Sequence, residues 1–217
     1  MTHKTKGIVL RCIKYGETSI IATLYTELFG VQSYIVKGVR QQTKKSAGKA
    51  NYFQPAAILQ MEVYQNNLKN LQFIKEYQWE YLYKKIYFDV ARNASAMYVT
   101  ELILRCMKQP EANPELFYLA EETLQQIDKC AETLAANMPL YFTVQLASIL
   151  GFQLQGAYSK TNTVLDLSEG AILPERVVKR VLRGKNPVGA GRNRETGIGV
   201  ACNDARFQVD VGDAALS

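Results

Sequence analysis

The residues best suited to chemistry in this sequence are basic ones, gathered in segment 37–49. No Asp or Glu occurs between Leu28 and Met61, whereas the same stretch carries Lys37, Arg40, Lys44, Lys45 and Lys49. Lysine ammonium groups act as mobile point charges on phosphates, and an arginine guanidinium can hold a phosphate through two parallel hydrogen bonds. An acid-free basic segment therefore predicts contact with a polyanion, and nucleic acid is the commonest of these.

Aromatic side chains lie close to this basic segment in the sequence. Tyr34 alternates with Ser33 and Ile35, and we expect its ring on the outer face of a strand together with Arg11 or Lys14. Bases of a single-stranded nucleic acid stack on such rings, and each contact contributes about 1–3 kcal/mol. The alternative is that the rings fill a core and that the basic segment is a solvated connector whose charge serves only solubility.

Residues for bond chemistry do not form a usable set. The sequence holds one histidine, His3, so it lacks both a Ser-His-Asp and a Cys-His constellation. No Cys-x-x-Cys pair occurs among its four cysteines, which are Cys12, Cys106, Cys130 and Cys202. We therefore expect free thiols, no metal, no cofactor and no enzymatic activity.

Alternation of apolar residues predicts five strands in residues 1–79. The expected strands cover 6–14, 19–26, 31–37, 58–64 and 71–77. Such short strands, with one long loop after the third, favour a small closed or partly open barrel, because an open sandwich would leave long unpaired edges. Residues 1–79 are thus expected to form a barrel domain, the first part of an α+β fold.

Residues 80–171 change to the three-and-four spacing of amphipathic helices, which predicts a helical domain behind the barrel. A first stripe runs from Ala94 to Arg105. Asn113 followed by Pro114 is typical of a helix start, with Asn as the N-cap and Pro at the first helical position.

A third helix is expected to open at Pro139 and to end at Gly151 in the left-handed conformation. Apolar stripes on helices are usually core. Part of this stripe could nevertheless form a groove for a partner peptide, lined by Leu146, Ile149, Leu150 and Phe152.

The composition changes abruptly near Ile172. Every tyrosine lies at or before Tyr158, whereas six of the ten arginines follow it. We interpret residues 172–217 as an atypical, poorly packed basic tail, and a truncation or frameshift would explain it.

The chain of 217 residues has a formal net charge of +6, which favours anionic partners. No apolar run approaches the ~20 residues that a membrane-spanning helix needs. The first residues do not have the pattern of a signal peptide, so a cytoplasmic location with no membrane partner is expected.

Four short motifs resemble the start of RecO, the bacterial recombination mediator: Lys6-Gly-Ile-Val-Leu-Arg11, Tyr15-Gly-Glu-Thr18, Leu24-Tyr-Thr-Glu-Leu-Phe-Gly30 and Lys37-Gly-Val-Arg40. The resemblance extends over about residues 4–170. It implies an OB-fold followed by a helical domain, binding to single- and double-stranded DNA, and annealing of complementary strands. It also implies loading of RecA onto strands coated by single-stranded-DNA-binding protein (SSB), with RecR and the acidic SSB tail as partners. By position, Lys37 and Arg40 fall on the family's basic motif.

The chain departs from the family pattern where many members carry a zinc knuckle, because no cysteine follows Gly151 closely; we therefore expect no zinc. Two other interpretations stay open. One is an OB-fold protein that binds RNA, and the other is a protein-interaction adaptor whose helical domain does the work.

Overall fold

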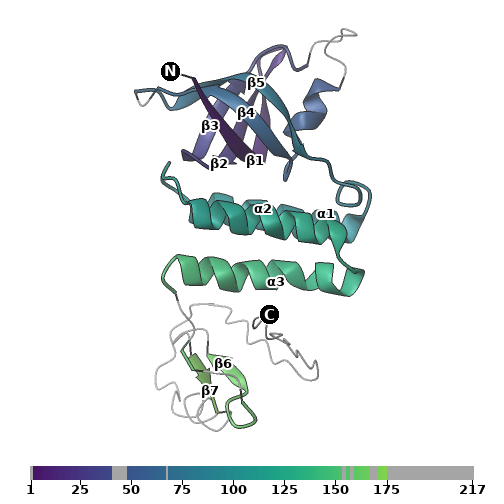
Figure 1. The fold of residues 1–217 in the computed structure, drawn as a ribbon, viewed down its shortest axis with the longest axis vertical. Coiled ribbons are helices and arrows are strands. Elements are labelled where there is room, and N and C mark those ends of the chain that lie inside the picture. The colour runs from purple at the N-terminus through teal and green to yellow at the C-terminus, as the bar shows by residue number, and fades with distance from the viewer. Residues whose placement is uncertain are drawn as a thin grey trace, which may run out of the picture.

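The first 81 residues close into a barrel in the computed structural model (Figure 1), which describes residues 2–40, 48–66, 68–152, 155–156, 159–166 and 171–174. Its strands are β1 (Thr2–Tyr15), β2 (Ser19–Thr26), β3 (Gly30–Val36), β4 (Ile58–Tyr64) and β5 (Leu71–Tyr81). The order around the barrel is β1-β2-β3-β5-β4, and only the β3–β5 pair is parallel. This is the five-stranded arrangement of an OB-fold, and it confirms the expected class.

One apolar cluster fills the inside of the barrel. It takes alternate residues of the strands, such as Leu24 on β2 and Leu59 on β4, and Phe53 closes one end from the short 3₁₀ helix η1 (Lys49–Phe53). Period-two alternation produces this pattern because successive side chains of a strand point to opposite faces. β1 departs from it: Ile8, Val9 and Leu10 are all buried, so this strand is covered on both faces.

Three helices follow the barrel: α1 (Val90–Cys106), α2 (Pro114–Lys129) and α3 (Glu132–Ile149). The predicted start of α2 is confirmed, because Asn113 Oδ1 accepts a hydrogen bond of 3.0 Å from the Leu116 amide and Pro114 is the first helical residue. The predicted end of α3 is confirmed too. Gly151 has φ of 87°, and the amide of Phe152 donates to the Ala147 carbonyl.

Two helical predictions were wrong. Most members of the predicted stripe are exposed, namely Ala94, Met97, Tyr98, Glu101 and Arg105, and Glu101 and Arg105 form an ion pair of 2.6 Å; of the stripe only Leu102 packs against the core. α1 instead buries Ala96, Val99, Thr100 and Ile103. α3 begins at Glu132, so Pro139 lies inside the helix. A proline removes one backbone hydrogen bond there, but buried residues on both sides of it, Ala135 and Phe142, hold the helix against the core.

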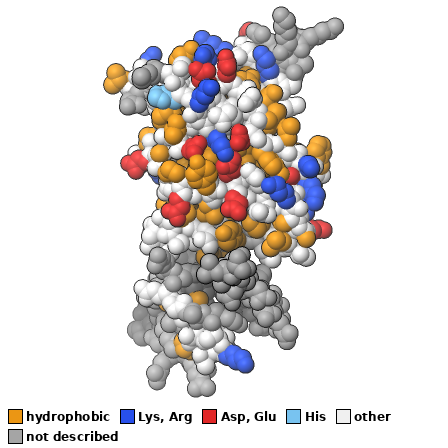
Figure 2. Space-filling model, viewed as in Figure 1, with side chains coloured by type: hydrophobic (Ala, Val, Ile, Leu, Met, Phe, Trp, Pro, Cys, Tyr) orange, Lys and Arg blue, Asp and Glu red, His pale blue; other side chains and the backbone are white. Residues whose placement is uncertain are grey.

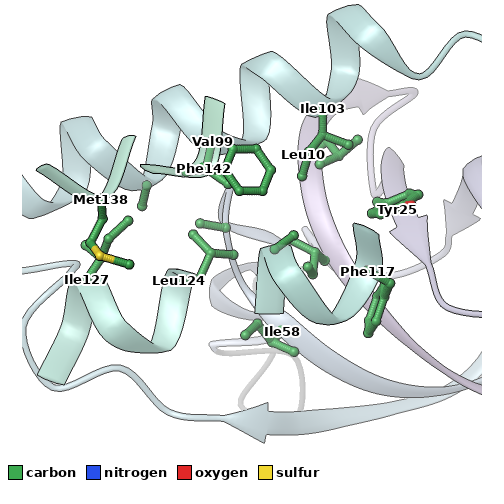
Figure 3. Packing of buried hydrophobic residues seen from close by; sticks show 14 of the residues in the cluster. Leu10, Tyr25, Ile58, Val99, Ile103, Phe117, Leu124, Ile127, Met138 and Phe142 are labelled. Atoms are coloured by element: carbon green, nitrogen blue, oxygen red, sulfur yellow. The ribbon is translucent and has the colours of Figure 1, made fainter. Parts of the chain in front are cut away.

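The helices and the outer face of the barrel share a second apolar core (Figure 3). Leu10, Tyr25 and Ile58 come from the barrel, and they pack with helical residues that include Val99, Ile103, Phe117, Leu124 and Phe142. α1 and α2 lie directly against the barrel, and α3 lies on their far side (Figure 1). Burial of these barrel residues therefore depends on the helices.

Polar contacts fix the same junction. The Lys6 ammonium lies 3.0 Å from a carboxylate oxygen of Glu121 on α2, and the Tyr25 hydroxyl donates to the Asn113 carbonyl at 3.0 Å. The turn between β2 and β3 approaches the loop before α2 so closely that a Cβ at Gly30 would overlap the Glu111 backbone. With φ of 62°, Gly30 is also in the left-handed region that favours glycine.

Beyond α3, two short strands pair antiparallel: β6 (Val164–Asp166) and β7 (Ala171–Leu173). The sequence pattern did not predict them.

The interpretation of residues 172–217 as a basic tail falls almost wholly outside the described residues. None of the helices in the described part of the chain is long and apolar enough to span a membrane.

Candidate nucleic-acid interface

A groove opens on the barrel where the end of β3 separates from β5. Its volume is about 560 Å³, and its lining includes Lys37, Lys49, Tyr64, Phe73 and Tyr77. The parallel pairing of the two strands covers only Ser33–Ile35 against Leu71–Phe73, so past the last residues of β3 the β5 strand is paired with β4 but no longer with β3. The groove therefore results from the short register of this pair.

Lys37 directly follows the last residue of β3 and lies at the edge of this groove. Its ammonium lies 5.6 Å from the centre of the Phe73 ring, and the ring itself remains 39% exposed. A cation over an aromatic face is held by the ring's electron-rich surface. The arrangement places a positive charge beside an exposed aromatic ring.

Beside Tyr77, the rings of Tyr52 on η1 and Trp79 on β5 pack against the apolar core inside the barrel. Tyr52 stacks on Trp79 with ring centres 4.7 Å apart and 19° between the planes, and it meets Tyr77 edge-on at 5.2 Å. Burial raises the pKa of Tyr77, and the neighbouring Tyr52 raises it further, so its hydroxyl stays neutral and able to donate. All three rings are half-buried, which leaves part of each accessible to a ligand.

The charges around the groove are unequal. Lys75 also lines it, but its ammonium lies 2.9 Å from a carboxylate oxygen of Glu62. Lys37 and Lys49 have no such acidic partner among the described residues, and both are exposed. Figure 2 shows basic and acidic side chains mixed both over the barrel end farthest from the helices and over the helices. Lys37 and Lys49 are therefore the groove cations most available to an anion.

The other predicted basic residues do not all join this groove. Arg40 is exposed, but its guanidinium donates to the Gly16 carbonyl at 3.3 Å and its amide to the Thr18 carbonyl. This contact attaches the segment after β3 to the β1–β2 turn, at the end of β1 where Lys14 lies. Arg11 is exposed on β1, and β2 lies between β1 and β3. Lys44 and Lys45 lie outside the described residues.

Tyr34 is not on the outer face, so that expectation was wrong. It is fully buried inside the barrel with Leu24 and Val36, and burial raises the pKa of its hydroxyl strongly. The alternation along β3 is as predicted, but the face that carries Tyr34 points inward because the barrel closes on that side. A base has no access to this ring.

We expect Tyr34→Phe to bind single-stranded DNA like the wild type and to be equally stable or up to about 1 kcal/mol more stable. The Tyr34 hydroxyl is close to Thr26 but makes no hydrogen bond of good geometry with the described residues, and removal of a poorly satisfied buried polar group is neutral or favourable. Urea unfolding and a binding titration of the two proteins measure both quantities. A binding loss at unchanged stability would contradict the assignment of Tyr34 to the core.

The aromatic groove residues Tyr64, Phe73 and Tyr77 were missed by the sequence analysis. Period-two alternation in 71–77 places Phe73 and Lys75 on one face, and this signal could have pointed to them. Their proximity to Lys37 has no local signal, because β5 comes more than thirty residues after β3 in the sequence.

The four residues predicted to bind a partner peptide differ in exposure: Leu146 is buried, whereas Ile149, Leu150 and Phe152 are partly or largely exposed. Leu146 is only 3% exposed and belongs to the core shared with the barrel, so it cannot line an open groove. It faces inward because it follows Phe142 by four residues on the buried side of α3. Ile149 is half-buried, Leu150 is 37% exposed and Phe152 is 74% exposed.

The described residues contain no cluster of three or more His, Cys, Asp or Glu side chains that could hold a metal ion. Cys12, Cys106 and Cys130 are free thiols, and burial raises the pKa of Cys12.

A closed barrel in OB order, with a helical bundle packed on its outer face, defines the chain as an OB-fold protein with an attached helical domain. Family models then identify the lineage. Residues 1–83 match "Recombination protein O N terminal" and residues 87–159 match "Recombination protein O C terminal". The chain belongs to the RecO family.

Curated relatives agree with this assignment. The chain is 31% identical to the DNA repair protein RecO of Phocaeicola vulgatus over 151 residues, 70% of this chain and 61% of the relative. It is 32% identical to that of Flavobacterium psychrophilum, over 70% of this chain and 63% of the relative. It is 33% identical to that of Bacteroides fragilis, with 70% and 61% covered. The chain thus spans about three fifths of the length of these relatives.

Proposed function

We propose that this chain binds single-stranded DNA along the groove between β3 and β5 and acts in DNA repair as a recombination mediator. The observation that carries the proposal is the Lys37 ammonium held over the exposed Phe73 ring, beside Lys49 and the Tyr52–Trp79 stack. Cations for phosphates next to rings for bases are the two elements of single-strand recognition. Membership of the RecO family and the relatives' name, DNA repair protein RecO, support DNA as the ligand.

The mechanism is electrostatic capture followed by stacking, without bond chemistry or a cofactor. Phosphates release counterions when lysines neutralise them, and this release drives the first contact. Bases then stack on rings that the barrel holds in place. Two strands carried this way can meet and pair, so we propose strand annealing as the activity, with binding to duplex DNA through the same cations.

The partners proposed are RecR and the acidic tail of SSB, and the role proposed is help in loading RecA onto strands that SSB covers. Ile149, Leu150 and Phe152, at the end of α3, are the candidates for a peptide contact, without the buried Leu146. A pull-down with wild type and Phe152→Ala tests this surface; undiminished capture of SSB by the variant places the contact elsewhere.

The DNA assignment is tested by titrating the protein with a fluorescent oligonucleotide over a range of salt concentrations. If all five cations of segment 37–49 neutralise phosphates, log K falls with log salt at a slope near −3.5, from about −0.7 per contact. Competition by RNA of the same sequence distinguishes the RNA-binding alternative. Absence of DNA binding at low salt refutes the proposal, and annealing of complementary strands is measured in the same preparation.

A further inference from the structure

Lys75 is a third cation of the β3–β5 groove, at a place where β5 departs from regular strand geometry. On β4, Glu62 pairs with Glu76 and the next residue, Val63, pairs with Ile74, so Lys75 has no partner residue on that strand. Lys75 is therefore the extra residue of a β-bulge. Bulges of this kind redirect side chains and are common beside functional sites.

The bulge leaves the Lys75 side chain on the outside of the barrel. Ile74 and Tyr77 both pack against the core inside the barrel, whereas the two residues between them, Lys75 and Glu76, are exposed. Regular alternation would turn one of these two inward, because successive side chains of a strand point to opposite faces. Lys75 instead lines the same groove as Lys37.

One carboxylate holds this cation in the structure. A carboxylate oxygen of Glu62 lies 2.9 Å from the Lys75 ammonium, and the two side chains are 20% and 41% exposed, respectively. Water and salt weaken an ion pair with this exposure, and the flexible stem of a lysine allows its ammonium to move to another anion. Glu62 would still have a cation nearby, because Lys4 lies directly opposite it on β1. Lys75 can therefore change partners without a change in the barrel.

We propose that Lys75 is a third phosphate-binding residue of the groove and that Glu62 competes with the nucleic acid for its ammonium group. The proposal rests on the proposed binding of single-stranded DNA in this groove and adds an exchange of ion-pair partners to it. Glu62 holds Lys75 in the free protein, and a phosphate takes the place of Glu62 in the complex. Glu62 therefore lowers the affinity for DNA, because its attraction for Lys75 opposes the phosphate contact.

The first measurement is the salt dependence of binding to fluorescently labelled oligo(dT), for the full chain and its Lys75→Ala variant. Each phosphate contact on a single strand contributes about 0.7 to the slope of log K against log salt. We expect the slope of the variant to be smaller by that amount, although Lys75 is paired in the free protein. An unchanged slope would show that the ammonium stays with Glu62 in the complex, and it would overturn the proposal.

The second measurement uses Glu62→Gln, which keeps the shape of the side chain and removes its charge. At ~0.1 M salt we expect this variant to bind oligo(dT) roughly fivefold more tightly, because no carboxylate competes with the phosphate for Lys75. In the Lys75→Ala background the same replacement should change the affinity by less than about twofold, since salt screens charges that are not in contact. Equal gains with and without Lys75 would overturn the proposal, because Glu62 would then act only by repelling the strand.

Glu76→Gln is the matched control. It removes the same charge from an exposed residue that pairs with Glu62 across the two strands and does not line the groove. We expect its affinity to stay within about twofold of the wild type, and a gain equal to that of Glu62→Gln would overturn the proposal. Failure of these effects in a wild type that binds oligo(dT) leaves the proposed function intact. A wild type that does not bind oligo(dT) at low salt refutes the proposed function, and this inference with it.

Discussion

Charge reversal at the groove, in the double variant Lys37→Glu/Lys49→Glu, is expected to weaken binding of single-stranded DNA about 100-fold at low salt. The two ammonium groups line the same groove and have no acidic partner in the described part of the chain, so each is available to a phosphate. Glutamates in their place repel the strand, and surface charges at contact distance interact by several kcal/mol in a medium of intermediate dielectric constant. Fluorescence anisotropy at low salt measures the loss.

The control keeps the same net charge. Each lysine-to-glutamate replacement changes the charge by −2, so both this variant and Lys108→Glu/Lys160→Glu fall from +6 to +2. Lys108 and Lys160 are exposed and lie outside the barrel. The alanine version, Lys37→Ala/Lys49→Ala, should reduce the salt slope by about 1.4, from about 0.7 per lost contact. Equal losses in both glutamate variants would show that net charge, rather than the groove, governs binding.

The second large effect concerns stability. Asp128→Ala is expected to lower the free energy of unfolding by about 3–5 kcal/mol, because it leaves three backbone donors without an acceptor, one of them buried and two partly buried. Asp128 on α2 is only 2% exposed, and its carboxylate accepts from the amides of Lys84, Lys85 and Ile86 at 2.7–3.1 Å. These contacts attach the segment between β5 and α1 to the helical bundle. Chemical denaturation measures the loss, and Glu122→Ala, an exposed carboxylate on the same helix, is the control.

The same carboxylate gives a pH dependence. Burial raises the pKa of Asp128, but the three backbone donors outweigh burial and leave the pKa below its ordinary value of 3.8. A carboxyl with a lowered folded-state pKa stabilises the fold above its unfolded-state pKa, and this contribution disappears as pH falls through the folded-state value. The wild type should therefore lose more stability below about pH 4 than Asp128→Asn does. Parallel acid-unfolding curves of the two proteins would contradict this role.

Sequence signals that act within a few residues explain most of the strands and helix ends that were predicted correctly. The five strands follow from alternation, and the start of α2 from the Asn113-Pro114 pair, because each signal acts within a few residues. The face that an element buries is a different question. Tyr34 shares the correct alternation but points inward, and α1 buries Val99 and Ile103 rather than the stripe that includes the exposed Met97 and Tyr98. Apolar residues on both faces leave the choice to the neighbouring elements.

The candidate site was likewise predictable only in part. The basic segment and the family could be recognised from the order of residues alone, because charge and motif are properties of the chain itself. The groove could not, because it exists only where β3 and β5 separate and Lys37 comes to lie over Phe73.

The sequence by itself determined the five barrel strands, the start of α2, the end of α3, the acid-free basic segment and the membership of the RecO family. Only the tertiary structure decided which aromatic rings are accessible, which leucine of α3 is core, and which lysines share a groove. The physical reason is closure: a barrel brings residues of distant strands into contact and buries one face of each strand, and neither result is encoded within a short stretch of chain.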